Sequence, residues 1–202
     1  MPEIIGIDFD NTILRYDEVI YQVARELQLI PEETPREKTL IRDLIRNGPE
    51  GDKGWQVVQG QIYGKRILGA QMSPGLKGFV LDRRARGDKL KIVSRKTQFG
   101  HFDESKTDLQ LAALGWMKAN KFFERSGLQF SEDEVFFAKT RAEKLKIIGE
   151  LRCTLFIDDL IEVLTEPEFP QGCKKILYGE KLELHDEIRG FETWDEIVEV
   201  LA

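Results

Sequence analysis

The stretch Ile4-Ile5-Gly6-Ile7-Asp8-Phe9-Asp10-Asn11-Thr12 decides the fold that we expect of this chain. It begins with apolar, mostly β-branched residues, which are typical of a central parallel strand buried on both faces. The apolar run breaks at Asp8, and ligands bind beyond the carboxyl ends of such strands, so Asp8 and Asp10 are expected to face one crevice. Crowded carboxylates repel unless a cation joins them. Mg2+ is the natural candidate, because it binds one or two carboxylates together with phosphate oxygens and water.

Strand-like and helical segments alternate along the rest of the chain. After a first strand at 3–8, further apolar segments of strand length lie at 90–94, 134–138, 154–158 and 175–178. Helical spacing of apolar residues is found at 105–125, 141–151 and 194–201. This alternation predicts right-handed crossovers, and hence an α/β fold with a doubly wound parallel sheet.

The long connection between the first two strands interrupts this pattern. It is far longer than one crossover needs, and it shows helical periodicity at 19–29, 38–45 and 55–68, with a Gly-rich polar segment at 47–54. A helix at 74–86 then returns the chain to the sheet. We therefore predict a core made of 1–13 and 74–202, and a small helical cap inserted at 14–73 that would exclude water and select substrates.

The composition limits the classes of function. The 202 residues suit one α/β domain with an insertion, and the formal net charge of −6 argues against nonspecific binding to nucleic acid or to an anionic membrane. Cys153 and Cys173, with His101 and His185, form neither a zinc-binding spacing nor a disulfide framework. We therefore expect a cytoplasmic protein with no nucleic-acid and no membrane partner. Whether it is a monomer or a homodimer stays open.

Two later strands also end in chemically useful side chains. Ser94 ends the strand 90–94, where its hydroxyl can donate to a phosphate oxygen, and it is followed by Arg95 and Lys96. Both cations are candidates to bind substrate anions, although a solvated loop edge is the ordinary state of such residues. Asp158 and Asp159 end the strand 154–158 and form a second acidic pair. Two acidic strand ends at one edge of a sheet indicate one metal site.

A helix after the strand 134–138 offers a lysine to the same edge. Thr140 and Glu143 have the spacing of a capping box, which places Lys144 in the first turn of this helix. Lys139 precedes the cap and could reach the crevice instead. Both lysines stay candidates on this reasoning.

Each of these features has an ordinary structural alternative. A pair such as Asp8 and Asp10 at a strand end often forms a turn or caps a helix, and a lone Ser94 often bonds its own backbone. A lone Lys144 is most often a solvated helix residue. Asp158 and Asp159 could simply cap a following helix at 160–164. The order of the features and their strand contexts make coincidence improbable.

Taken in order, DFDNT at 8–12, Ser94, Lys144 and IDD at 157–159 resemble the four motifs of the haloacid dehalogenase (HAD) superfamily, whose members are mostly phosphatases. The resemblance covers roughly residues 1–179, and the inserted cap matches the family only by position and helical character. It implies a Rossmann-like core and a Mg2+-dependent hydrolase that acts on the phosphomonoester of a small phosphorylated metabolite. Between the two lysines, spacing to the acids of the fourth motif favours Lys144 over Lys139.

The resemblance also implies roles for the carboxylates. Asp8 would attack phosphorus and form an aspartyl-phosphate, and Asp10 would protonate the leaving oxygen and then deprotonate the attacking water. Mg2+ would bind Asp8, the backbone carbonyl of Asp10, and Asp159, while Asp158 orients that shell or binds through water.

Cationic and hydroxyl groups would bind the phosphoryl oxygens. Ser94 and Lys144 would spread the charge of the transferring group, and we expect Thr12 and Arg95 to contribute to substrate binding. One alternative function is that of a phosphotransferase or mutase that works through the same intermediate. Another is that of a noncatalytic metal-binding regulatory module. The sequence does not separate these alternatives and does not identify the substrate.

Overall fold

The computed structural model describes residues 2–100, 106–184 and 187–202, so His101, His185 and the first residue of the helix expected at 105–125 lie outside the described residues. The chain forms two compact units. The first unit comprises Met1–Leu14, Met72–Lys96 and Lys121–Ala202, and the second comprises Arg15–Gln71 and Thr97–Asn120.

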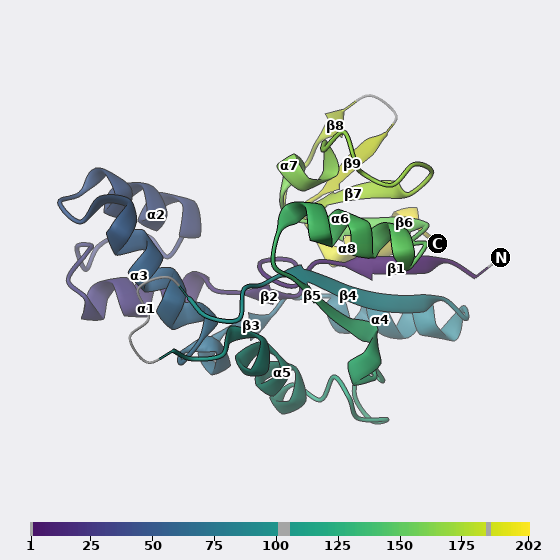
Figure 1. The fold of residues 1–202 in the computed structure, drawn as a ribbon, viewed down its shortest axis with the longest axis horizontal. Helices are drawn as coiled ribbons and strands as arrows, with labels where there is room; N and C mark the ends of the chain where they lie inside the picture. Colours follow the sequence, from purple (N-terminus) through teal and green to yellow (C-terminus); the bar gives the residue numbers. More distant parts are fainter. Residues whose placement is uncertain (1, 101–105, 185–186) are drawn as a thin grey trace. The chain divides into compact units, whose positions relative to one another are not determined.

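The first unit is built on a seven-stranded sheet in the order β5-β4-β1-β6-β7-β9-β8 (Figure 1). The strands, in sheet order, are β5 Val135–Ala138, β4 Lys89–Arg95, β1 Ile4–Ile7, β6 Leu155–Asp158, β7 Lys174–Tyr178, β9 Ile188–Phe191 and β8 Glu183–Leu184. Every neighbouring pair is parallel except β8 and β9. From β1 the chain adds β4 and β5 on one side and later β6, β7 and β9 on the other, so the predicted doubly wound α/β fold is confirmed.

Helices of the first unit pack on both faces of this sheet. They are α4 Leu76–Ala85, α6 Arg141–Glu150, α7 Ile161–Leu164 and α8 Trp194–Val200, with a 3-10 turn, η2, at Glu132–Glu134. Leu145 and Ile148 of α6 share one buried cluster with Leu177 of β7. The next residue, Tyr178, stacks on Trp194 of α8 with ring centroids 5.1 Å apart. Because successive side chains of a strand point to opposite faces, α6 and α8 cover different faces of the sheet.

A glycine allows close packing at the centre of the sheet. Gly6 in β1 pairs with Phe156 in β6, and a Cβ atom at residue 6 would lie 2.5 Å from the ring of Phe156. The ring therefore lies against the bare backbone of β1, which is a positional use of glycine in a strand interior. The same ring faces the Nζ atom of Lys144, 5.4 Å from its centroid.

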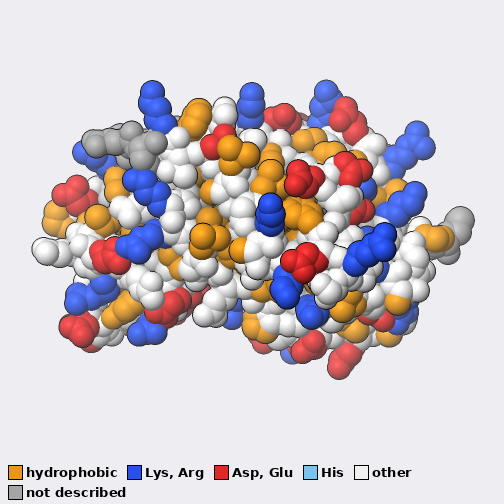
Figure 2. All heavy atoms as spheres, turned by 90° about the horizontal axis from the view of Figure 1, so that it is seen from below, with side chains coloured by type: hydrophobic (Ala, Val, Ile, Leu, Met, Phe, Trp, Pro, Cys, Tyr) orange, Lys and Arg blue, Asp and Glu red, His pale blue; other side chains and the backbone are white. Residues whose placement is uncertain are grey.

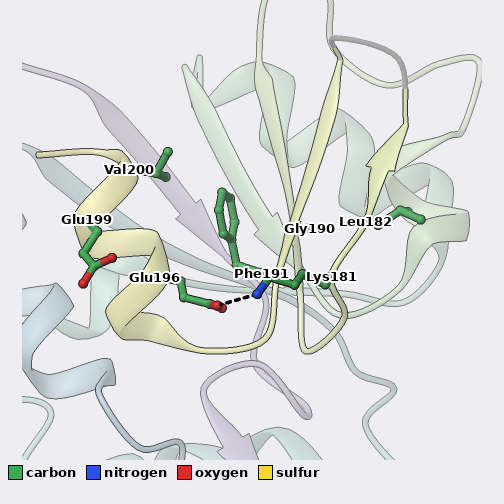
Figure 3. A pocket seen from close by; sticks show the side chains of 7 residues that line it. All are labelled: Lys181, Leu182, Gly190, Phe191, Glu196, Glu199 and Val200. Carbon is green, nitrogen blue, oxygen red and sulfur yellow. Dashed lines mark ion pairs between the residues drawn. The ribbon is translucent and has the colours of Figure 1, made fainter.

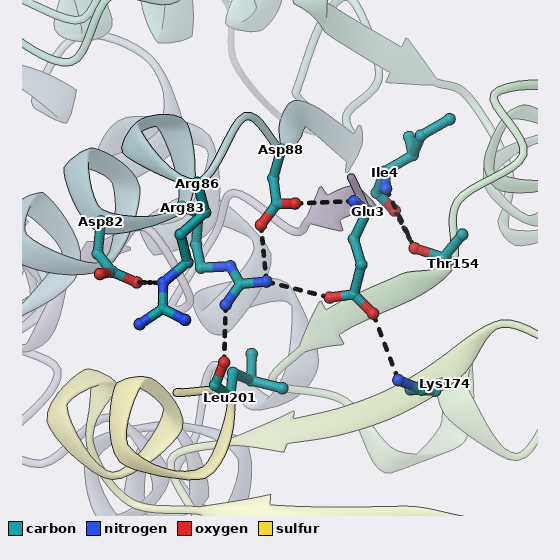
Figure 4. A network of polar contacts seen from close by, with 9 residues as sticks. All are labelled: Glu3, Ile4, Asp82, Arg83, Arg86, Asp88, Thr154, Lys174 and Leu201. Carbon is teal, nitrogen blue, oxygen red and sulfur yellow. Dashed lines mark hydrogen bonds and ion pairs between the residues drawn. The ribbon is translucent and has the colours of Figure 1, made fainter. Parts of the chain in front are cut away.

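An ion-pair network joins the start and the end of the chain in the first unit (Figure 4). Arg83 of α4 is 6% exposed, and its guanidinium lies 2.6 Å from Oδ2 of Asp88 and 3.2 Å from Oε2 of Glu3. It also donates to the carbonyl oxygen of Leu201 at 2.9 Å. The backbone N–H of Glu3, just before β1, donates to Oδ1 of Asp88 at 2.7 Å. Asp88 therefore pairs with the buried cation and also accepts a hydrogen bond from the start of the first strand.

The second unit is helical. It contains α1 Asp17–Glu26, α2 Lys38–Asn47, α3 Gly51–Tyr63, a 3-10 turn η1 at Ile67–Gly69, and α5 Leu109–Ala119. The helices α1, α2 and α3 correspond to the patterns at 19–29, 38–45 and 55–68. The third begins earlier than expected, inside the Gly-rich segment, and ends at Tyr63.

The second unit also includes 97–120, which we predicted from the sequence to belong to the core. The reason is the packing of α5, whose Trp116 is fully buried and donates from its indole nitrogen to the carbonyl oxygen of Ala70 at 2.9 Å. A helical pattern shows that a helix has an apolar face, but not which partner that face packs against.

Two short strands mark two of the four places where the chain changes unit. β2, Leu14–Arg15, and β3, Gln71–Met72, pair in a separate two-stranded sheet, and the boundary between the units falls within both strands.

Acidic and basic side chains are interspersed on the face of the molecule drawn in Figure 2. No helix among the described residues has the length and apolar character needed to cross a membrane.

Candidate active site at the carboxyl edge of the sheet

The three central strands deliver the predicted site residues to one edge. Ile7, the last residue of β1, pairs with Ile92 of β4 and with Ile157 of β6. Asp8 follows directly, and its backbone N–H donates to the carbonyl oxygen of Ile157 at 2.8 Å. In this register, Asp158 ends β6 beside Asp8, and Ser94 lies just beyond Ile92 on β4. The structure therefore brings Asp8, Ser94 and Asp158 to neighbouring strand ends.

A tight turn follows the first strand. The backbone N–H groups of Ile13 and Leu14 both donate to the carbonyl oxygen of Phe9, at 3.0 and 3.2 Å. Asn11 has a φ of 65°, a left-handed conformation that Asn tolerates better than most residues. The turn places Asp10 and Thr12 after the strand end. Thr12 is completely buried, and its hydroxyl has no hydrogen-bond partner within the part of the chain that the structure describes.

Lys144 is the lysine of the site. Its side chain is 2% exposed, and its Nζ atom lies 2.5 Å from Oδ1 of Asp8 and 2.7 Å from Oδ2 of Asp158. Lys139 is exposed. The structure therefore places Lys144, and not the exposed Lys139, in contact with the carboxylates, and its role in the chemistry stays a prediction.

The start of α6 explains how Lys144 reaches the carboxylates. Thr140 is the N-cap, and its hydroxyl accepts from the backbone N–H of Glu143 at 3.1 Å, as the sequence predicts. The carboxylate of Glu143 accepts from the backbone N–H of Lys139 at 2.7 Å rather than from that of Thr140, so the reciprocal half of the box is shifted by one residue. This cap begins the helix next to the strand edge, with Lys144 in its first turns.

Three carboxylates form a group that could hold a metal ion. Asp8, Asp158 and Asp159 each offer an oxygen, and these atoms lie within 4.8 Å of one another. An all-carboxylate set of this kind suits a hard divalent cation such as Mg2+. Among the described residues the Asp10 side chain is not in this group. The expected contribution of its backbone carbonyl stays a prediction.

The charge balance of the group is uneven, because one buried ammonium serves two buried carboxylates. Burial raises the pKa of Asp8 to about 7, with Lys144 opposing this rise and Asp158 and Asp10 adding to it. Burial alone would lower the pKa of Lys144, but Asp8 and Asp158 outweigh it and hold that pKa above its usual value. The lysine is therefore a permanent cation, whereas Asp8 needs a further positive charge to stay ionised at neutral pH.

Asp158 also has a local structural role. Its Oδ1 atom accepts from the backbone N–H of Leu160 at 3.0 Å, while its Oδ2 atom accepts from Lys144. The capping alternative considered for this residue is therefore partly realised at the approach to α7. Both oxygens are fixed by these bonds, which suits a residue that orients the site.

The residues that end β4 differ in what they face. Ser94 is 1% exposed, and its hydroxyl has no hydrogen-bond partner among the described residues, as expected of a group placed for a ligand. Arg95 is exposed. Lys96 is 3% exposed, and its Nζ atom lies 3.0 and 2.8 Å from the two carboxylate oxygens of Asp10. The sequence made Lys96 a candidate to bind a substrate anion, with a solvated loop edge as its ordinary state, and the burial of its side chain is the feature that was missed.

A hollow of the first unit lies apart from these residues. It is bordered by β9 and α8 and lined by Lys181, Leu182, Gly190, Phe191, Glu196, Glu199 and Val200 (Figure 3). Lys181 and Glu196 form an ion pair at 3.4 Å there. None of the predicted site residues lines this hollow, so it plays no part in the chemistry considered below.

The fold matches that of several solved hydrolases. A HAD-superfamily hydrolase from Ehrlichia chaffeensis is 13% identical with a TM-score of 0.59, over 100% of this chain and 97% of its own. A predicted phosphoglycolate phosphatase from Haemophilus somnus is 14% identical with a TM-score of 0.57, over 100% and 98%. A HAD-family hydrolase from Deinococcus radiodurans, with bound phosphate and sodium, is 12% identical with a TM-score of 0.57, over 100% and 95%. No family model and no curated protein matches the chain.

Proposed function

We propose that this chain, which has the fold of the HAD-superfamily hydrolases, is a divalent-metal-dependent phosphatase acting on the phosphomonoester of a small metabolite. One observation carries the proposal: the buried Lys144 ammonium bridges Asp8 and Asp158 at 2.5 and 2.7 Å, within a carboxylate group that suits Mg2+. One of the solved proteins of this fold holds phosphate, and another is a predicted phosphoglycolate phosphatase, which supports the same class of reaction.

In the proposed reaction, Asp8 is the nucleophile. One carboxylate oxygen attacks phosphorus, the bond between phosphorus and the leaving oxygen breaks, and an aspartyl-phosphate forms. Asp10 gives a proton to the leaving oxygen and later takes one from the water that hydrolyses the intermediate. A divalent cation held by Asp8 and Asp159, with Asp158 beside it, would neutralise charge between the nucleophile and the phosphate.

The remaining groups bind the phosphoryl oxygens. The hydroxyls of Ser94 and Thr12 are buried and have no hydrogen-bond partner among the described residues, so a phosphate oxygen would satisfy them without displacing another bond. Lys144 supplies positive charge beside Asp8, which stabilises the transferring group by preorganised electrostatics. Arg95 is exposed and would contact only the outer part of a substrate.

We propose further that the second unit acts as the cap of this enzyme. The chain enters it at Arg15, shortly after Asp10 and Thr12, and again at Thr97, directly after Ser94, Arg95 and Lys96. Motions of the second unit would therefore act on the two segments that carry site residues, as expected of a cap that gates access.

The decisive experiment measures phosphate release from an aryl phosphate and a panel of phosphorylated metabolites, with Mg2+ or with chelator. Wild type should turn over in Mg2+ alone, and Asp8→Asn should abolish turnover while keeping the fold by circular dichroism. The exposed Lys139→Met variant should keep wild-type activity. Undiminished turnover by pure Asp8→Asn protein would refute the mechanism. Transfer of phosphate to a second metabolite without release would favour phosphotransfer over hydrolysis.

A further inference from the structure

A buried lysine that the mechanism above does not use lies just after β4. Lys96 is 3% exposed, and its backbone N–H donates to the carbonyl oxygen of Ala138, at the end of β5, at 2.8 Å. Its Nζ atom contacts both carboxylate oxygens of Asp10, at 3.0 and 2.8 Å, and lies 5.6 Å from the centroid of the Phe9 ring. The backbone is thus fixed by the sheet, and the ammonium is directed at one carboxylate.

The side chain of Asp10 lies outside the group of carboxylates that could hold a metal. Asp10 follows Asp8 by two residues, yet only Asp8, Asp158 and Asp159 form the group of oxygens within 4.8 Å among the described residues. A divalent cation in that group attracts any neighbouring carboxylate, and a coordinated carboxylate is a poor proton carrier. Asp10 therefore needs a competing cation to keep its side chain available for proton transfer.

We propose that Lys96 is a positioning residue, which holds the Asp10 side chain away from the metal group and in the orientation that proton transfer needs. This inference rests on the function proposed above. In this role Lys96 would act through Asp10 rather than by binding the metal or the phosphoryl group itself. A purely structural role predicts something else, namely that Lys96 only compensates a buried charge and that its loss lowers stability without changing what Asp10 does.

Metal binding separates these two roles without any need for turnover. Mn2+ affinity is measured by calorimetry for wild type, Asp10→Asn, Lys96→Met and the double variant. With Lys96 present, Asp10→Asn should change the affinity by less than about twofold, because the side chain is not a ligand. In the Lys96→Met background, Asp10 has lost this ion pair and should join the metal, so Asp10→Asn should weaken binding by at least about fivefold.

Controls keep this cycle interpretable. Lys146→Met removes a lysine from the same protein at a site that is 73% exposed, and it should give the wild-type response to Asp10→Asn. Lys96→Arg should restore the wild-type response, because it returns the cation. Lys96→Gln provides a second, polar replacement in case Lys96→Met does not fold. Equal effects of Asp10→Asn in both backgrounds, whether large or absent, overturn the proposal.

Turnover provides the second readout. An alkyl phosphate needs a proton on its leaving oxygen, whereas an aryl phosphate with an acidic phenol needs less help. Lys96→Met should therefore slow the alkyl substrate by about 100-fold or more. With the aryl substrate it should release one equivalent of phenol in a burst and then turn over slowly, because the aspartyl-phosphate still needs Asp10 as base. In the Asp10→Asn background, Lys96→Met should not slow turnover any further.

The two proposals fail in different ways. If wild type shows no phosphatase activity but the metal cycle shows the expected coupling, the proposed function is wrong, and of the inference only the part that Lys96 keeps the Asp10 side chain off the metal stands. If wild type is an active phosphatase and the effects of Lys96→Met and Asp10→Asn simply add, the function stands. In that case Lys96 acts independently of Asp10, and the inference is overturned.

Discussion

The ammonium of Lys144 lies 2.5 Å from Oδ1 of Asp8, although 136 residues separate the two in the chain. It also lies 2.7 Å from Oδ2 of Asp158, so a single buried cation balances two buried carboxylates. Without this lysine the two buried carboxylates would face each other with no cation between them. The contact therefore links the stability of the core to the chemistry of the site.

Replacing Lys144 should damage both properties. Lys144→Met leaves Asp8 and Asp158 facing each other without their shared cation, and should lower the free energy of unfolding by about 3–5 kcal/mol in metal-free buffer. Saturating Mg2+ should recover part of this loss, because the ion replaces the missing charge, but turnover should stay absent. Urea unfolding with and without Mg2+ measures the effect. Lys139→Met, at an exposed position just before α6, should change the free energy of unfolding by less than about 0.5 kcal/mol.

Metal binding should depend steeply on pH. Burial raises the pKa of Asp8 to about 7, so below that pH the metal must displace a proton from this carboxyl. The apparent affinity should rise about tenfold per pH unit up to pH 7 and then level off. Calorimetry in two buffers of different ionisation enthalpy counts the released proton. Asp8→Asn should bind metal more weakly and without this slope, and an unchanged slope in that variant would assign the proton to another group.

The same raised pKa has a consequence for folding in the absence of metal. A carboxyl that is protonated more easily in the folded state than in the unfolded chain favours folding below the unfolded pKa of 3.8. This contribution is lost as the pH rises through the folded pKa of about 7. Metal-free protein should therefore gain stability from Asp8 as the pH falls from 7 toward 4. Asp8→Asn should show a smaller gain over this range in pH-dependent urea unfolding.

The meeting of the acidic strand ends at one edge could be predicted from the sequence better than the division into units, for a physical reason. Asp8, Asp10, Asp158 and Asp159 follow apolar runs that can only be buried strands, and parallel strands end at one edge. The role of Lys96 was not predictable, because its burial depends on the turn that brings Asp10 to it. Sequence patterns report the face that an element buries, whereas the direction of a loop side chain is set by tertiary contacts.

The shorter strands could not be predicted from the sequence either. β2 and β3 have two residues each, and β9 contains Gly190, whose absent side chain weakens any strand signal. Gly190 is needed there, because a Cβ atom would lie 2.4 Å from the carbonyl oxygen of Glu180. Close backbone approach of this kind leaves no trace in hydrophobic periodicity.

The network around Arg83 should matter for stability and not for chemistry. Arg83 is 6% exposed and pairs with Asp88 and Glu3, so Arg83→Met leaves the buried Asp88 carboxylate without its cation and should cost about 3–5 kcal/mol in the free energy of unfolding. Arg86→Met removes a neighbouring arginine whose pair with Asp82 is 43% and 34% exposed, and should cost less than about 1 kcal/mol. Urea unfolding measures both. The kcat of folded Arg83→Met protein should equal that of wild type within about twofold, and a larger loss would connect this network to the site.

Removing the second unit requires two deletions, because two segments of the chain build it. Deleting 16–71 alone leaves α5 without α3 and η1, and exposes the apolar face formed by Leu109, Ala113, Trp116 and Met117. Exposed apolar faces of this size promote association, so this variant should aggregate in size-exclusion chromatography. Replacing 97–120 as well with a short Gly-Ser linker removes that face and should give a monodisperse protein.

This smaller protein should bind Mn2+ within about threefold of wild type, because Asp8, Asp158 and Asp159 all belong to the first unit. Its preference among phosphorylated metabolites should flatten, as expected if the second unit selects the substrate. If the single deletion is as soluble as the double one, α5 does not depend on the rest of the second unit. If the double deletion no longer binds Mn2+, the metal group does depend on the second unit.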